Sequence, residues 1–346
     1  AVNSVSFSFD SLRIASASHD RTIQIHQVPH TLVQNITDFN DEVQDVCFSH
    51  KGDLIASASF NNIVRISRVI DGSVVHELHG FIGGVNSISF SHNDQLLAST
   101  CDDELVRIWN VTTGLLQHTL TGHHGGINSV CFNDDDTLLA SASEDETVRI
   151  YNMTNHSLTQ ELTGHNNNVY SVCFSHNGKW VASGAADTYI RICSVQNGSL
   201  FHELHGHRGD VLDVCFNSDD TLLASGSWDQ TVRIWNVHNG SLIRILKGHS
   251  DCVNGVCFNA DSTLVASCSD DKSVHLYSVR YGSLIQTFKE HTASVRSVCF
   301  NPDNTVLASA SNDGTVLIHT LNLEQINGYT LQTQNMVQNK STLYFV

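Results

Sequence analysis

The sequence predicts an all-β fold in which one small antiparallel sheet is repeated eight times. A six-residue phrase that begins with Val or Ile and ends with Phe recurs through the chain of 346 residues. Seven copies follow one another at steps of 42 residues, and an eighth lies 41 residues before them. A constant period of this size indicates a repeat architecture. The copies are Val2–Phe7, Val43–Phe48, Val85–Phe90, Ile127–Phe132, Val169–Phe174, Val211–Phe216, Val253–Phe258 and Val295–Phe300.

Each repeat contains four short strands separated by turns. In residues 207–248, Val211–Phe216 alternates with the period of two that is typical of a strand. Residues 221–227 form a second strand rich in Leu and small residues, and 231–235 form a third with β-branched residues. Residues 241–246 form the fourth. Short strands with frequent turns and no helical period favour an antiparallel all-β structure.

A single sheet of this kind has apolar residues on both faces, so it needs neighbours to cover it. Sheets packed face to face around an axis cover one another and close into a ring. The sequence therefore predicts a β-propeller of eight four-stranded antiparallel blades, with a seven-bladed ring as the less favoured alternative. We expect the propeller to span residues 1–331 and residues 332–346 to be a C-terminal tail or degenerate strand. Residues 325–331 would supply the last outer strand, so that the ring closes by side-chain packing alone.

The charge balance narrows the classes of partner. The chain carries 18 Lys and Arg against 35 Asp and Glu, a formal net charge of −17. Nucleic-acid binding needs a clustered basic face, which this sequence does not contain. No apolar run is long enough to span a membrane. A basic protein or peptide is therefore the expected partner, with no nucleic acid and no membrane involved.

Cysteine placement predicts the compartment. Six of the ten cysteines occupy one position of the recurring phrase, where they are expected to be small buried packing residues. Equivalent positions on successive sheets lie too far apart for disulfides, which need Cα atoms within about 7 Å. Unpaired thiols are typical of a reducing compartment. We therefore expect a cytoplasmic protein, with the nucleus as the alternative.

Several segments resemble a known repeat family. Gly206-His207, Leu223-Ala224-Ser225-Gly226-Ser227-Trp228-Asp229 and Val232-Arg233-Ile234-Trp235-Asn236 are similar to the motifs of a WD repeat. The resemblance covers about residues 1–331. It implies a hydrogen-bond network of His, Ser, Asp and Trp within each blade. The residues that match this network are His207, Ser225, Asp229 and Trp235; His123, Ser141 and Asp145; His165, Ser183 and Asp187; His249, Ser267 and Asp271; and His291, Ser309 and Asp313.

The first three repeats depart from this pattern. Phe39 and Phe81 stand where the family has His, and Asn61 stands where it has Asp. We therefore expect these blades to form the softer side of the ring.

Nothing in the sequence indicates catalysis, a metal or a cofactor. The His, Ser and Asp trio imitates a catalytic triad, but it recurs in five repeats, whereas an active site occupies one place. No Cys-x-x-Cys occurs, and no glycine-rich phosphate loop is present. The histidines in general are spaced by the repeat rather than by ligand geometry. The only local groups are His123-His124 and His202, His205 and His207, where zinc is the less favoured interpretation. The protein is therefore predicted not to be an enzyme, and to hold no metal or cofactor.

The resemblance also implies where a partner binds. In WD-repeat propellers, three variable positions in each blade line the face that carries the His-containing loops. In this sequence those positions include large apolar residues, several acids and one arginine. We expect the apolar residues to anchor a peptide and the acids to select Lys or Arg. The candidate binding residues are Trp228, Leu212, Tyr170, Asp210, Asp270, Glu144, Asp102, Phe60 and Arg296.

These observations favour a non-enzymatic interaction scaffold that binds a protein or peptide on this face, within a multiprotein complex. The alternative is a sensor or substrate-receptor domain of a larger signalling or ubiquitin-ligase protein. That alternative rests on the first residue, Ala1, which lies inside a strand phrase without a preceding Met, and on the strand-like end of the tail.

Overall fold

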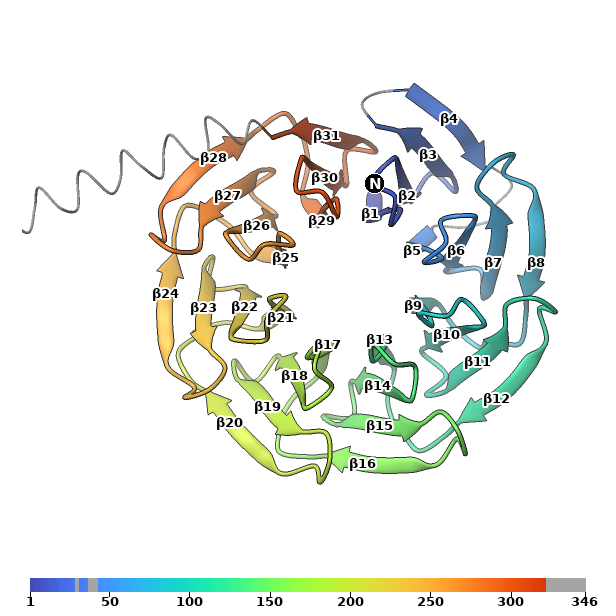
Figure 1. Ribbon diagram of the computed structural model, residues 1–346, viewed down its shortest axis with the longest axis horizontal. Helices are drawn as coiled ribbons and strands as arrows, with labels where there is room; N and C mark the ends of the chain where they lie inside the picture. Colours follow the sequence, from blue (N-terminus) through green and yellow to red (C-terminus); the bar gives the residue numbers. More distant parts are fainter. Residues whose placement is uncertain (29–30, 37–42, 322–346) are drawn as a thin grey trace, which may run out of the picture.

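The computed structural model describes residues 1–28, 31–36 and 43–321, in which 31 β-strands form eight separate sheets. The sheets are arranged around a central axis like the blades of a propeller, as Figure 1 shows. Blades 1 to 7 have four antiparallel strands, and blade 8 has three within the described residues. The predicted eight-bladed all-β propeller is therefore confirmed. The expected outer strand at 325–331 and the tail at 332–346 lie outside the described residues.

Strands are named in chain order from the centre of each blade outward (Figure 1). The innermost strands carry the recurring phrase and line the axis. They are β1 (Val2–Phe7), β5 (Val43–Phe48), β9 (Val85–Phe90), β13 (Ile127–Phe132), β17 (Val169–Phe174), β21 (Val211–Phe216), β25 (Val253–Phe258) and β29 (Val295–Phe300). The second strands are β2 (Arg13–Ser18), β6 (Leu54–Ser59), β10 (Leu96–Cys101), β14 (Leu138–Ser143), β18 (Trp180–Ala185), β22 (Leu222–Ser227), β26 (Leu264–Ser269) and β30 (Val306–Ser311).

The third and fourth strands complete each blade toward the rim. The third strands are β3 (Ile23–Gln27), β7 (Ile63–Arg68), β11 (Val106–Asn110), β15 (Val148–Asn152), β19 (Ile190–Ser194), β23 (Val232–Asn236), β27 (Val274–Ser278) and β31 (Val316–Thr320). The outer strands are β4 (Thr31–Ile36), β8 (Val74–Leu78), β12 (Leu116–Leu120), β16 (Leu158–Leu162), β20 (Leu200–Leu204), β24 (Leu242–Leu246) and β28 (Leu284–Phe288). None of the described residues forms a helix long and apolar enough to cross a membrane.

The hydrophobic core lies between neighbouring blades rather than inside any one of them. Ile190 and Ile192 of blade 5, for example, pack against Val211, Val214 and Leu223 of blade 6. This arrangement explains the sequence pattern, because the second and third strands of a blade are covered on both faces and consist of apolar and small residues. Each blade is thus stabilised by its neighbours.

The ring closes between blades 8 and 1 through the same kind of packing. Val2 and Val5 of β1 lie in one apolar cluster with Val306, Ala308 and Ala310 of β30. The Cys299 thiol also reaches the Val5 carbonyl, at 3.5 Å. Strands from the two ends of the described chain therefore meet by side-chain packing, and each stays in its own sheet.

Polar side chains join the innermost strands across the seams. Asn3, Asn86, Asn128 and Asn254 hold the second position of their strands, and each donates to the carbonyl of the first residue of the next blade, at 2.9 to 3.2 Å. Because this interaction recurs at one position, we call it the asparagine clamp.

Two half-buried carboxylates tie three blades each. Asp213 of blade 6 accepts hydrogen bonds from Ser171 of blade 5, from its neighbouring Val214 N–H and from the Val256 N–H of blade 7. Asp45 of blade 2 makes the same three bonds, to equivalent partners in blades 1, 2 and 3. Burial raises the pKa of Asp213 to about 6 and raises the pKa of Asp45 as well.

The ten cysteines are all free thiols. The six in the recurring phrase are half-buried, not fully buried as predicted, because alternate residues of each innermost strand are turned away from the packed core. The Cys131 thiol reaches the Val172 carbonyl of the next blade, at 3.5 Å. Burial raises the pKa of Cys131 to about 12, so this group stays a protonated thiol.

Candidate partner-binding face

Five blades contain a buried chain of hydrogen bonds between Ser, His and Asp. In blade 6 the His207 Nε2 atom lies 2.8 Å from the Ser225 hydroxyl, and Nδ1 lies 2.9 Å from the Asp229 carboxylate. A neutral imidazole satisfies both contacts by accepting from Ser225 and donating to Asp229. Trp235 Nε1–H donates to Ser225 at 2.9 Å and completes the chain. The same His contacts, at 2.8 to 3.0 Å, occur at His123, His165, His249 and His291.

These networks anchor loops and offer no nucleophile. Asp229 Oδ1 accepts from Thr231. Asp229 Oδ2, the oxygen that contacts His207, also accepts from the Arg208 N–H of the loop before the blade. The carboxylate therefore ties this loop to the turn between β22 and β23. The Ser225 side chain is completely buried, so no substrate reaches its hydroxyl.

Blade 3 holds its turn aspartate by a different group. Phe81 occupies the position of the histidine, and the Arg107 guanidinium lies over the Phe81 ring, 4.8 Å from its centre. Arg107 donates to both oxygens of Asp103, at 3.0 and 2.8 Å. Trp109 still donates to Ser99. In blade 2, by contrast, the side-chain amide of Asn61 is buried with no partner among the described residues. Phe39 lies outside the described residues.

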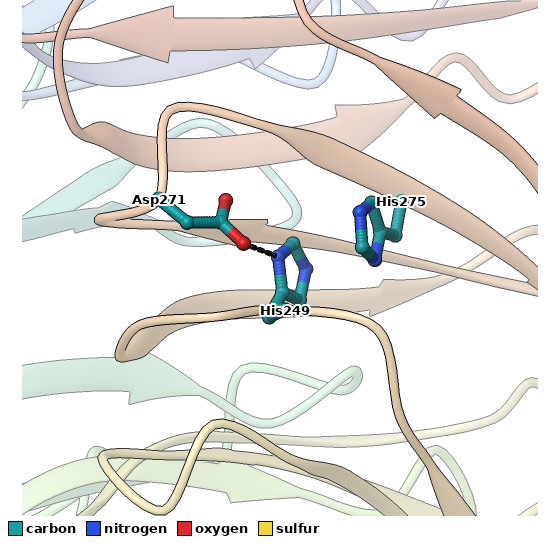
Figure 2. A group of neighbouring side chains, drawn as sticks. All are labelled: His249, Asp271 and His275. Carbon is teal, nitrogen blue, oxygen red and sulfur yellow. Dashed lines mark hydrogen bonds and ion pairs between the residues drawn. The ribbon is translucent and has the colours of Figure 1, made fainter.

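Two groups of side chains come close enough to suggest a metal site. In blade 7, His275 replaces the arginine of other blades and lies beside His249 and Asp271, as Figure 2 shows. The two imidazole rings are nearly parallel, with centres 3.8 Å apart and planes 9° apart, so their in-plane lone pairs cannot meet at one ion. His275 is also satisfied by Ser273 and Tyr277.

The second group does not fit a metal either. It consists of Asp251, Cys252 and Asp270. Burial and the nearby Asp251 raise the pKa of Cys252 to about 11, because both disfavour the thiolate. Arg296 already occupies Asp270, at 3.2 Å.

The variable positions predicted from the resemblance lie at one end of the ring. This end carries the loops that enter each blade and the turns between second and third strands, and we call it the top face. Residues of the two segments are joined directly, since Trp228 N–H donates to the Asp210 carbonyl at 2.9 Å. The equivalent bond joins Glu144 N–H to the Gly126 carbonyl in blade 4.

Trp228 is the most exposed aromatic residue of the predicted set, with 52% of its surface accessible. It stands beside Asp210. Tyr170 and Leu212 were expected to be exposed but are half-buried. The Tyr170 hydroxyl lies 3.4 Å from the Asp210 carboxylate, and burial together with the charges of Asp210 and Glu144 raises the pKa of Tyr170. Trp228 and Tyr170 therefore form an arc over blades 3 to 6 together with the carboxylates of Asp210, Glu144 and Asp102.

The remaining predicted residues lie over blades 7, 8 and 2. Arg296 pairs with Asp270, so neither charge is free for a partner as the sequence suggested. Phe60 is exposed and lines a cavity of about 490 Å³ at the mouth of the central channel, which Arg296 and Gln44 also line. The structure thus separates the predicted residues into the arc and a second group, in which Phe60 and Arg296 line this mouth and Asp270 pairs with Arg296. Leu212 belongs to neither group and lines the central cavity between the blades.

Asp45 and Asp213 were not predicted as special residues. Six other repeats have Ser or Gly at the same position of the phrase, so comparison of the copies would have identified them. Their linking role depends on neighbouring blades, which the sequence of one repeat does not show.

Comparison with known proteins agrees with this architecture. The model of the family described as WD domain, G-beta repeat matches residues 1–27, 30–66, 72–110, 114–152, 156–194, 198–236, 240–278 and 282–320. The crystal structure of the computationally designed Ika8 protein is similar in fold, with a TM-score of 0.83 and 24% sequence identity over 93% of this chain and 96% of that one. No curated protein matches the chain. Eight matched repeats in an eight-bladed ring place the chain in the WD40 family of G-beta repeats.

Proposed function

We propose that this propeller is a non-enzymatic scaffold whose top face binds a basic segment of a protein partner. WD40 propellers generally mediate protein interactions. The observation that carries the proposal is the arc of Trp228, Tyr170, Asp210, Glu144 and Asp102 on one side of that face. An exposed aromatic residue beside carboxylates suits an anchor that also attracts Lys or Arg.

Several further features support this proposal. The Ser residues of the five networks are buried, which argues against hydrolysis. The overall charge of −17 favours a basic partner and speeds its encounter. Free thiols throughout the chain suit a reducing compartment, the cytoplasm or the nucleus.

The test is affinity capture from native lysate, with the captured proteins quantified by mass spectrometry. Trp228→Ala and Leu212→Ala are each compared with the unaltered chain. Leu158→Ala is the matched control, because Leu158 is an exposed apolar residue on the outer strand β16, away from the top face. We expect the two top-face variants to lose a basic partner that Leu158→Ala retains. Equal recovery by all four proteins would contradict the proposal.

A further inference from the structure

The top face contains the same polar arrangement twice, four blades apart. Asn254 Nδ2 donates to Asp270 in blade 7 at 2.7 Å and clamps the Val295 carbonyl at 2.9 Å. In blade 3, Asn86 Nδ2 donates to Asp102 at 2.8 Å and clamps the Ile127 carbonyl at 3.2 Å. The two aspartates therefore have the same position, the same partner and the same orientation relative to the next blade.

In blades 7 and 8 this arrangement is filled by a guanidinium group from the chain itself. Arg296, the second residue of β29, donates from NH1 to Asp270 at 3.2 Å and from Nε and NH2 to the Asn312 side-chain oxygen, each at 3.2 Å. Asn312 lies in the turn between second and third strands of blade 8. The arginine therefore spans an acceptor on one blade and an acceptor on the next.

In blades 3 and 4 the equivalent acceptors are both carboxylates, and the equivalent of Arg296 is the short Asn128. Glu144 stands at the position of Asn312. A Cβ atom built on Gly126 would lie 3.3 Å from the Glu144 Oε2 and 3.5 Å from the Asp102 Oδ1. Both carboxylates thus lie against the same glycine, which has no side chain to come between them. Asn128 points elsewhere, since it clamps the Val169 carbonyl at 3.0 Å.

We infer that Asp102 and Glu144 bind the guanidinium of an arginine supplied by the partner, in the way that Asp270 and Asn312 hold Arg296. This inference rests on the proposed function and names the partner's side chain. A planar guanidinium donates on two edges, so it contacts two acceptors at once, whereas the ammonium of lysine acts as a compact point charge. The open site carries one more negative charge than the filled one and selects a cation more strongly.

The first test measures binding of a blocked pentapeptide, Gly-Gly-Arg-Gly-Gly, by titration calorimetry at low salt. The double variant Asp102→Asn and Glu144→Gln should bind it at least tenfold more weakly. Glu104→Gln and Glu146→Gln form the matched control, because these exposed acids lie in the same two turns. The same peptide with citrulline, which has arginine's shape without its charge, should not bind. Equal affinity in the two double variants would overturn the inference.

The second test exchanges the roles of the two sites. Asn128→Arg places the resident arginine in blade 4, so it should fill the open site and abolish peptide binding. Arg296→Ala vacates the other site, so the stoichiometry should rise from one peptide to two, the second bound more weakly. Unchanged binding by Asn128→Arg would contradict the inference. A circular dichroism melt checks that each variant is folded.

The outcomes separate this inference from the proposed function. If the pentapeptide binds at Asp102 and Glu144 but Trp228→Ala loses no partner, the arginine site stands and the wider arc is wrong. If Trp228→Ala loses its partner and the pentapeptide experiments fail, the top face binds a partner but not through this arginine.

Discussion

In blade 6 an imidazole holds the turn aspartate Asp229, and in blade 3 a guanidinium holds the equivalent Asp103. His207 makes one bond to Asp229 and one to Ser225, and so links the turn to the middle of β22. Arg107 makes two bonds to Asp103 and one to the Gly80 carbonyl, and rests on Phe81. The loop and the turn are joined in both blades. The difference teaches that a neutral imidazole, by donating a hydrogen bond, and a guanidinium, by forming an ion pair, can each hold the half-buried carboxylate of this turn.

The largest expected effect is the loss of the aspartate itself. Asp229→Ala should lower the free energy of unfolding by about 3–5 kcal/mol, because it leaves the His207 and Thr231 donors buried without their acceptor. Asp103→Ala should cost a similar amount, since it strands the buried Arg107. Urea denaturation measures both, and Glu146→Ala, an exposed acid, should change stability by less than about 0.5 kcal/mol. A small effect in blade 3 alone would show that its arginine pair is not equivalent.

The second prediction replaces the histidine arrangement of blade 6 with the phenylalanine and arginine arrangement of blade 3. His207→Ala should cost about 2–4 kcal/mol, because it removes a buried ring and its two hydrogen bonds. His207→Phe should cost about half as much, since Arg233 NH2 already lies 3.6 Å from Asp229 and can rest on the new ring as Arg107 rests on Phe81. Urea denaturation compares the two variants. Equal losses would mean that Arg233 cannot take over.

The third prediction concerns acid. Burial lowers the pKa of His123 and of His207 below the value of about 6.5 expected in the unfolded chain. The unfolded chain therefore takes up these protons first, so the stability from the networks is present above pH 6.5 and is lost as pH falls below it. The arginine pair of blade 3 has no such group. The double variant His123→Phe and His207→Phe should consequently lose less stability between pH 7 and pH 5 than the unaltered chain.

The variant and the unaltered chain are compared with each other because Asp213 changes the stability with pH in the opposite direction. Its pKa in the folded chain, about 6, exceeds its unfolded value, so its carboxyl gains stability as pH falls toward 4. The contribution is common to both proteins and cancels. Equal pH dependence of their urea midpoints would contradict the assignment to histidine.

The smallest expected effect concerns the tryptophan that the two blades share. Trp235 and Trp109 each donate one hydrogen bond to a buried serine, at 2.9 and 2.8 Å. Trp235→Phe and Trp109→Phe should each cost about 1 kcal/mol, as expected for one lost hydrogen bond. Thermal unfolding of the two variants checks this. A clearly larger loss in blade 6 would show that the serine and histidine act together with the indole.

How much of this could be predicted from the sequence depends on how far apart the contacting residues are. The period of 42 and the alternation within each strand predict the blades, because both are local. The replacement of His by Phe81 was visible, but not that Arg107 would compensate, since that arginine is present in other blades as well. Likewise Asp270 and Arg296 were each predicted to meet a partner and instead meet one another. Contacts across a seam depend on geometry that no single repeat contains.

Arg296 has a consequence for local opening of the ring between blades 8 and 1. At its position, four other blades use a short amide to fasten the next blade, and a side chain that reaches back into blade 7 cannot also reach forward to blade 1. At the opposite end of the same seam, Pro302 of blade 8 has no N–H that could donate to blade 1. The buried hydroxyl of Ser11 in blade 1 has no partner among the described residues. Within the described residues this junction therefore has fewer polar links than the seams that carry an asparagine clamp, and we expect the amide protons of β1 and β29 to exchange first.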